Sequence, residues 1–163
     1  MRIIRSQVRP SSPEFLQRQE SMRELVDTLR AALAESRLGG GEKYTKRHEA
    51  RGKLLPRERI ELLLDPGSHF LELMPLAGHG IRGVGPGAGN IGGIGVVSGV
   101  ECMISASEAT LKGGAINEYG LKKGLRLQEI AARSRLPFIS LTESAGADLP
   151  NQSKLFVPGG KTF

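Results

Sequence analysis

Two short loops of small residues carry the groups that could take part in chemistry. Ser144-Ala145-Gly146-Ala147 follows an apolar run, and its small side chains leave backbone N–H groups open to a carbonyl oxygen. Backbone donors aimed at developing negative charge stabilise an enolate or a tetrahedral oxyanion, and losing one donor costs about 3–4 kcal/mol. An ordinary strand-to-helix turn is the alternative interpretation. Another small-residue loop, Glu108–Gly114, comes earlier in the chain and contains a lysine at position 112, so we call 108–114 the first loop and 144–147 the second loop.

The elements around the two loops decide between these interpretations. Phe138–Leu141 has the length and composition of a buried strand, and 94–97 with 100–105 is typical of a hairpin. Strand, glycine-rich loop, helix, strand and glycine-rich loop then follow in order. A right-handed crossover brings both loops to one edge of the sheet. Two permissive loops and Lys112 at this edge predict a site for a phosphorylated ligand with a carbonyl group.

The helix between the two loops is expected to be amphipathic. Its predicted inward face consists of Leu121, Gly124, Leu125, Gln128, Ala131 and Ala132. Its predicted outward face consists of Lys122, Arg126, Glu129 and Arg133.

Two further helices are expected before residue 68. Ser12-Pro13-Glu14 is typical of a helix start, and Gly39-Gly40-Gly41 ends the pattern. Between them an apolar stripe predicts contact with a core or a partner; it consists of Phe15, Met22, Leu25, Leu29 and Leu33. Pro56 opens the other helix, which Asp65-Pro66-Gly67 closes. Its predicted inward residues are Ile60, Leu63 and Leu64.

A glycine-rich segment at 83–93 contains the pattern G-x-G-x-x-G at 87–92. A dinucleotide-binding fingerprint needs a strand before this pattern and a helix after it. Ile94–Val97 continues as β-structure instead, so we interpret the segment as a flexible loop that enters a strand. Before it, Phe70–Met74 alternates weakly and is a candidate strand.

Composition bounds the remaining possibilities. A chain of 163 residues holds one globular unit with extensions. The net charge of +6 is concentrated in 43–59 and 122–135, which predicts either a solvated helical face or phosphate binding. Nucleic-acid binding is disfavoured because only 4% of the residues are aromatic and none is Trp.

Cysteine and histidine usage gives no metal-binding pattern. The single cysteine, Cys102, excludes an internal disulfide and is expected to pack as a small apolar residue. His48, His69 and His79 have no partners at metal-ligand spacing. No apolar run approaches the length of a membrane span, and Met1–Arg5 lacks the apolar core of a secretory signal. We therefore expect no metal, no membrane partner and a cytoplasmic location.

The sequence resembles the β (carboxyltransferase) subunit of biotin-dependent acyl-CoA carboxylases, closest to the methylcrotonoyl-CoA and geranyl-CoA carboxylase branch. The resemblance extends to about Pro150, and its most specific part is Arg51–Ser68. The matching segments are Ser11–Phe15, Gly39–Lys43, Arg51–Ile60, Leu63–Ser68 and Val97–Ile104.

This resemblance implies an α/β fold of the ClpP/crotonase type, in which ββα units bind acyl-CoA. We expect residues 1–68 to form an N-terminal helical extension and residues 69–163 to form an incomplete crotonase-like domain. The implied reaction transfers a carboxyl group from carboxybiotin, carried by a partner α subunit, to the acyl-CoA carbon acidified by its thioester. The family also implies homo-oligomers, and neither nucleic acid nor membrane is an expected partner.

The resemblance assigns roles to the two loops. Ala147, supported by Gly146, is implied as the backbone oxyanion donor. The implied CoA-binding residues are Lys112, Gly113, Gly114, Ser144 and Ala145, with Lys112 near a CoA phosphate or the adenine. No side-chain nucleophile is needed.

Departures from the family leave two questions open. Glu108 stands where the family usually has Asp, and Ala145 stands where it has Gly. Ala115–Tyr119 replaces a stretch that is usually aromatic and contains proline. Because the acyl chain is expected at this stretch, the choice of acyl-CoA is open. Family subunits are several times longer. We expect the isolated chain to lack the second oxyanion loop and the C-terminal half that receives biotin. A non-catalytic acyl-CoA-binding or subunit-interaction module is the alternative.

Overall fold

A computed structural model describes residues 6–162, so the expectation for Met1–Arg5 lies outside the described residues. The helices and strands are α1 (Pro13–Ser36), α2 (Glu42–Glu49), α3 (Pro56–Leu63), β1 (Leu71–Leu73), β2 (Asn90–Val97), β3 (Val100–Ser107), α4 (Glu118–Ser134), β4 (Phe138–Leu141) and α5 (Gln152–Gly159). The strands form one sheet in the order β1-β2-β3-β4, in which only β3 and β4 pair in parallel. The expected α/β class and the candidate strand within Phe70–Met74 are confirmed.

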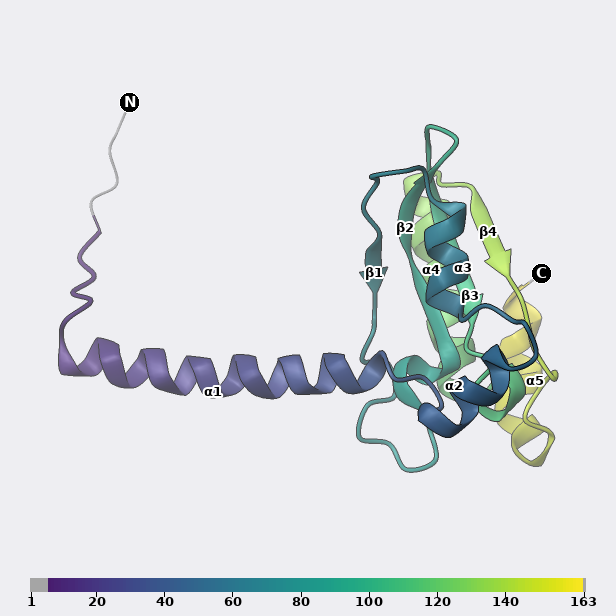
Figure 1. The fold of residues 1–163 in the computed structure, drawn as a ribbon, viewed down its shortest axis with the longest axis horizontal. Helices are drawn as coiled ribbons and strands as arrows, with labels where there is room; N and C mark the ends of the chain where they lie inside the picture. Colours follow the sequence, from purple (N-terminus) through teal and green to yellow (C-terminus); the bar gives the residue numbers. More distant parts are fainter. Residues whose placement is uncertain (1–5, 163) are drawn as a thin grey trace.

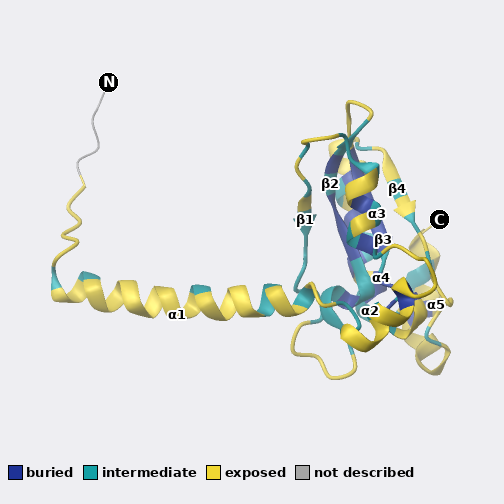
Figure 2. Cartoon of the chain, viewed as in Figure 1, coloured by how far each residue is buried: buried dark blue, intermediate teal, exposed yellow. Residues whose placement is uncertain are grey.

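The sheet separates two apolar clusters, and each lies under one helix. Ile60 of α3 packs with Ile104 of β3 on one face, and Leu127 of α4 packs with Met103 on the other. Successive strand residues point to opposite faces, which is why Met103 and Ile104 serve different clusters although both are fully buried. Figure 2 shows the buried residues concentrated in the central strands. The proposed division at residue 68 stays a prediction.

The β2–β3 hairpin is confirmed, and both strands are longer than the pattern indicated. Ser98 and Gly99 have φ values of 52° and 78°, the combination that a type I′ hairpin turn requires. The carboxylate of Asp65 accepts the N–H groups of Ser98 and Gly99, both at 2.7 Å. The turn that ends α3 thereby fixes the hairpin tip. Cys102 is buried, as expected of a small apolar residue.

The long helix α1 begins as predicted, because the hydroxyl of Ser12 accepts the N–H of Phe15 at 3.2 Å. Its apolar stripe is not part of a core, and that half of the prediction is wrong. No residue of α1 is buried, and Met22 and Leu25 are 60% and 66% exposed. Figure 1 shows why: α1 extends away from the sheet, so most of its length has nothing to pack against.

The two faces predicted for α4 are confirmed in part. Leu121 and Ala131 are buried as expected, and the four residues of the predicted outward face are exposed. The inward face differs because Leu127 is fully buried and Lys123 is 3% exposed, whereas Ala132 is exposed. Gly92 of β2 explains the rotation, because a Cβ there would overlap the side chain of Leu127. Because Gly92 has no side chain, the side chain of Leu127 packs directly on the backbone of β2 at this position.

The strand predicted at Phe138–Leu141 is confirmed with the same bounds, but the expectation that it is buried is wrong. Phe138 is 38% exposed and Ser140 is exposed, because β4 is the end strand of the described sheet. Helix α2 lies at 42–49, before Pro56, where the sequence pattern predicts no definite element. His48 on α2 is buried, and its Nε2 lies 3.1 Å from the carbonyl oxygen of Leu54.

Within residues 6–162, no group of three or more His, Cys, Asp or Glu side chains is placed to hold a metal ion. Within the same residues, no helix has both the length and the apolar character needed to cross a bilayer.

Candidate functional site

The two small-residue loops lie against each other, as predicted from the strand order. The N–H of Ala145 donates to the carbonyl oxygen of Gly113 at 2.9 Å. The hydroxyl of Ser144 donates to the carbonyl oxygen of Gly114 at 2.7 Å. A short parallel bridge between Ile116 and Ala147 continues the contact. The loops therefore form one connected rim beyond the sheet.

The parallel pairing of β3 and β4 explains this meeting. The N–H of Met103 donates to the carbonyl oxygen of Pro137 at 2.8 Å, and Ser105 is level with Ser140. The two strands end at the same height, with α4 as the connection between them. The carboxyl ends of parallel strands meet at one sheet edge, which places both following loops there.

The first loop has an unusual backbone at its centre. Lys112, Gly113 and Gly114 have φ values of 47°, 66° and 73°, all in the left-handed region. Glycine adopts this region without steric cost. A Cβ on Gly114 would in addition overlap the carbonyl oxygen of Glu143. The second glycine is thus required both by its own φ value and by the close approach of the two loops.

The amides of the second loop differ in what they can still bind. The N–H of Gly146 donates to the hydroxyl of Ser144 at 3.0 Å, and the N–H of Ala145 is bonded to Gly113. Within residues 6–162, the N–H of Ala147 has no hydrogen-bond acceptor, and Ala147 is exposed. Ala147 therefore has a donor available for a ligand, whereas that of Gly146 is engaged. Both assigned roles stay predictions.

The bridge sets the direction of the Ala147 N–H. Ile116 donates its N–H to the carbonyl oxygen of Gly146 at 2.9 Å and accepts the N–H of Asp148 at 3.0 Å. In a parallel pair, the residue between two such bonded neighbours points its own N–H to the opposite side. Ala147 is that residue, so its donor faces away from Ile116.

A hollow of about 290 Å³ opens beside this rim, and we call it the inner hollow. It lies between the N-terminal half of α4, the ends of β2, β3 and β4, and both loops. Hydroxyl groups of Ser105, Ser140, Thr142 and Ser144 come from the strand ends and the second loop. The remaining lining residues are Ala88, Gly89, Asn90, Ser107, Gly114, Ala115, Ile116, Gly120, Leu121, Gly124, Gln128, Phe138 and Thr162.

An ion pair joins the second loop to the N-terminal helices. Lys53, between α2 and α3, donates to a carboxylate oxygen of Glu143 at 2.6 Å. This hydrogen bond is the main reason that the pKa of Glu143 lies below its ordinary value. Arg59 of α3 reaches the carbonyl oxygen of Leu141 at 3.4 Å. Sequence analysis missed the pair because its members lie 90 residues apart and neither belongs to a local motif.

The first loop is held by the end of α1. Thr110 donates its hydroxyl to the buried carboxyl group of Glu108 and accepts the N–H of Gly40 at 2.8 Å. The N–H of Thr110 also donates to Glu108 at 3.2 Å. The glycine turn after α1 thus fixes the base of the loop that carries Lys112.

Lys123 is a further residue of the site that the sequence pattern did not reveal, because nothing in the run of charged residues on α4 indicates that this lysine is buried. Its ammonium group donates to the carbonyl oxygens of Asn90 at 2.6 Å and Gly87 at 3.2 Å. Burial lowers the pKa of Lys123 to about 8. Because Ala88 and Asn90 line the inner hollow, Lys123 anchors one of its walls. These hydrogen bonds connect the glycine-rich segment to α4. The segment continues into strand β2 and not into a helix, as we expected when we rejected the dinucleotide-binding motif.

The fold superposes on solved carboxyltransferase subunits, which have a crotonase-like fold. The model of the carboxyl transferase domain matches residues 47–161. The chain belongs to this family.

Relatives from several organisms agree with that assignment. The chain is 50% identical over 161 residues to a probable biotin-dependent acyl-coenzyme A carboxylase β2 subunit of Mycobacterium tuberculosis, covering 99% of this chain and 30% of the relative. It is 55% identical over 135 residues to a 3-methylcrotonyl-coenzyme A carboxylase β1 subunit of the same organism, covering 82% and 26%. This chain therefore spans less than a third of the length of these relatives, in their N-terminal part.

Solved structures show the same partial coverage. The β subunit of Pseudomonas aeruginosa geranyl-CoA carboxylase superposes with a TM-score of 0.75 at 42% identity, covering 97% of this chain and 30% of that subunit. The transcarboxylase 12S structure with methylmalonyl-coenzyme A, described as a hexamer assembly, has a TM-score of 0.78 at 27% identity, covering 86% and 28%. The expected resemblance to acyl-CoA carboxylase β subunits is confirmed.

Proposed function

We propose that the chain binds an acyl-CoA and polarises its thioester carbonyl, as the acyl-CoA-binding part of a biotin-dependent carboxyltransferase. The observation that carries this proposal is the unoccupied N–H of Ala147, exposed where two glycine-containing loops meet. Family membership supplies the reaction class, and the rim supplies the donor that such a reaction needs.

The chemistry assigned to this donor is stabilisation of an enolate. When the acyl carbon acidified by the thioester loses its proton, which the biotin nitrogen that gives up the carboxyl group would accept, negative charge develops on the thioester oxygen. A fixed N–H directed at that oxygen stabilises the charge more than it stabilises the neutral substrate. Carboxybiotin on a partner subunit is proposed to supply the carboxyl group when it is bound. Ala147 then needs no assistance from a side-chain nucleophile.

The other predicted residues form the surroundings of this donor. Gly113 and Gly114 allow the left-handed turn, and Ser144 and Ala145 bond that turn to the second loop. The inner hollow is proposed to hold the acyl group. A methylcrotonoyl-like substrate is the proposed choice, supported by the names of the relatives.

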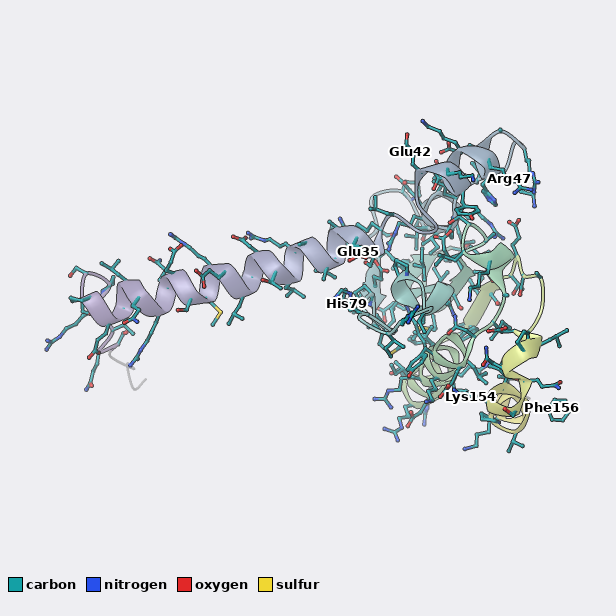
Figure 3. All side chains as sticks on the ribbon, turned by 90° about the horizontal axis from the view of Figure 1, so that it is seen from below. Glu35, Glu42, Arg47, His79, Lys154 and Phe156 are labelled. Carbon is teal, nitrogen blue, oxygen red and sulfur yellow. The ribbon has the colours of Figure 1, made fainter. Side chains whose placement is uncertain are left out.

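We also propose that the isolated chain is catalytically incomplete. The N–H and C=O groups of Phe138 and Ser140 point to the open edge of β4, because their neighbours bond β3. Phe156 and Val157 on α5 are 84% and 79% exposed, and Figure 3 labels Phe156 at the outer surface of α5. An open strand edge and exposed apolar groups of this size are typical of a surface that another polypeptide covers.

The proposed partners follow from the family. A carboxyltransferase C-terminal half, a biotin-carrying α subunit and further copies of the β subunit would complete the enzyme. A cytoplasmic site of action is proposed, and the relatives include both bacterial and mitochondrial chains. A chain that binds acyl-CoA or a partner without supporting catalysis is the alternative.

An infrared experiment tests the role of Ala147. The chain is titrated with 3-methylcrotonoyl-CoA that carries ¹³C at the thioester carbonyl. We expect the carbonyl band of the bound ester to shift to lower frequency in the wild type and in Ala147→Gly, which keeps the N–H. Ala147→Pro removes this N–H, which takes no part in the bridge, and should abolish the shift while the ester still binds. An equal shift in Ala147→Pro would refute the assignment.

A carboxylation assay tests completeness. The chain is mixed with the acyl-CoA, free biotin and a bicarbonate-charged partner subunit, and we expect no turnover. Turnover by the isolated chain would overturn the proposal of incompleteness. Turnover after addition of a C-terminal carboxyltransferase half would separate the enzymatic proposal from the non-catalytic alternative.

A further inference from the structure

The second loop is attached to two different parts of the chain. Its own residues, 144–147, bond the first loop. Leu141 and Glu143, on its approach from β4, instead contact α3 and the connection between α2 and α3. Figure 1 shows this connection passing close to the end of β4. The loop that carries Ala147 is therefore held from the N-terminal helices as well as from the first loop.

The sheet supports the approach to the second loop on one side only. In the described sheet, β4 pairs with β3 and its other edge is open. All four residues of the second loop are exposed. A segment with so few buried contacts opens locally at low cost in free energy. Side-chain contacts from elsewhere in the chain are therefore needed to keep this loop in one conformation.

Lys53 makes the strongest of these contacts. Its ammonium group donates to Oε1 of Glu143 at 2.6 Å, and a hydrogen bond between two charged groups is stronger than one between neutral groups. The two side chains are 48% and 31% exposed, so water screens the pair only in part. The carbonyl oxygen of Glu143 also lies against Gly114 of the first loop. The side chain and the backbone of Glu143 thus fix the same point of the chain.

His48 fixes the connection that carries Lys53. Its ring is buried on α2, and its Nε2 lies 3.1 Å from the carbonyl oxygen of Leu54. Because a carbonyl oxygen only accepts, Nε2 carries the proton and donates. The same Nε2 is 4.0 Å from Oε2 of Glu143. His48 therefore holds the residue next to Lys53 and faces the carboxylate that Lys53 binds.

We infer that Lys53 is a positioning residue of the site. It holds the second loop through Glu143 so that the N–H of Ala147 keeps one direction, and His48 holds Lys53 in place. The attachment of the loop rests on the contacts above, whereas its purpose of directing a donor at a thioester rests on the proposed function. The helices α2 and α3 are thereby part of the site, although no ligand needs to touch them.

Amide hydrogen exchange of the full chain, followed by NMR without any ligand, tests the attachment. The N–H groups of Ala145 and Asp148 lie on either side of Ala147, and both are bonded to residues 113–116. We expect Lys53→Met to lower the protection of both amides by about two- to fivefold, which is the effect of losing one part-exposed ion pair. Lys53→Arg, which keeps the charge, should keep most of the protection.

Two further variants sharpen this experiment. His48→Phe keeps a ring but removes the donor to Leu54, so it should lower the protection of the same two amides. Lys46→Met is the matched control, because Lys46 forms an ion pair of the same length, 2.6 Å, with Glu42 within α2. It removes the same charge from a site that does not contact the second loop, and it should leave the protection unchanged.

A reversed ion pair separates the contact from a general effect on folding. Lys53→Glu alone and Glu143→Lys alone each place two like charges together, and both should lower the protection of Ala145 more than Lys53→Met does. The double variant restores opposite charges and should recover much of the protection. If Lys53→Met does not fold, this comparison decides. Recovery in the double variant would support the inference, and equal loss in all three variants would overturn it.

The ¹³C-labelled ester of the infrared experiment tests the purpose of the attachment. At a saturating concentration of this ester, Lys53→Met should lose part of the carbonyl shift, because the donor is no longer held in one direction. Saturation keeps any change in affinity out of the comparison. Lys46→Met should show the full shift. A full shift in Lys53→Met would overturn the positioning role.

The outcomes also separate this inference from the proposed function. Unchanged protection of Ala145 and Asp148 in Lys53→Met would refute the attachment, whatever the ester does. If the protection falls as expected but the wild type gives no carbonyl shift, the attachment stands and the proposed function fails.

Discussion

Ile116 and Ala147 form a single parallel bridge that joins the two loops following β3 and β4. The bridge uses the carbonyl oxygen of Gly146 and the N–H of Asp148 and leaves the N–H of Ala147 unbonded within the described part of the chain. The bridge thus fixes the position of the Ala147 N–H and leaves this N–H free to donate to a ligand. The predictions below concern the residues that hold this arrangement in place.

Gly114→Ala should destabilise the chain by roughly 2 kcal/mol or more. The φ value of 73° is unfavourable for alanine, and its Cβ would overlap the carbonyl oxygen of Glu143. Gly124→Ala is the matched control, since it lies inside α4 with open space around a new Cβ. It should be neutral or stabilise by about 0.5–1 kcal/mol. Urea unfolding measures both, and equal stabilities would contradict the close approach of the loops.

Lys123 should make unfolding free energy depend on pH above 8. The pKa of Lys123 is about 8 in the folded chain, whereas the ordinary value of 10.5 applies to the unfolded chain. Between pH 8 and pH 10.5 the unfolded chain therefore binds more protons than the folded chain. Stability therefore rises with pH through this window, by up to about 3 kcal/mol in total. Lys123→Met should lack this rise. Urea unfolding of both proteins from pH 7 to 10.5 gives the difference curve, and a flat curve would exclude a buried lysine with a lowered pKa.

Glu143→Gln should loosen the second loop and destabilise the chain by roughly 0.5–1 kcal/mol at pH 7, because Lys53 loses its charged partner. The pKa of Glu143 is lowered by that partner, so the stabilisation is present above the ordinary value of 4.5. It is lost as the pH falls through the lowered pKa. In a double-mutant cycle, Lys53→Met should add little once Glu143 is Gln. Full additivity would mean that the two residues do not interact.

Thr110→Val should cost about 1–3 kcal/mol, since it removes the hydroxyl between Gly40 and the buried carboxyl group of Glu108. Thr28→Val is a control of the same size change on the exposed surface of α1, where the hydroxyl bonds only the carbonyl oxygen of Glu24. It should have an effect within about 0.5 kcal/mol. Thermal unfolding compares the two variants. Similar melting temperatures would show that the end of α1 does not support the first loop.

Sequence reasoning located the site because the information was local. Runs of small residues such as Ser144–Ala147 and Gly113-Gly114 favour loops, and a right-handed crossover between parallel strands brings the two loops to one edge of the sheet. The same reasoning failed for Leu127 and Ala132, because the face that a helix buries depends on the surface opposite it. Gly92, which receives Leu127, lies in another strand, and no pattern within α4 refers to it.

The supports of the site were also beyond the reach of the sequence pattern. Lys53 and Glu143 are 90 residues apart, and Gly40 and Thr110 are 70 apart. Charged residues such as Lys53 and Glu143 are common on surfaces, so their types alone do not reveal that they are partners.

The sequence by itself determined the class of fold, the family and the two loops, because these depend on hydrophobic period, turn residues and order along the chain. Only the tertiary structure decided which amides remain free, which lysine is buried and which charged groups meet. These properties depend on distances between segments that are remote in sequence, and the packing of the sheet and helices sets those distances.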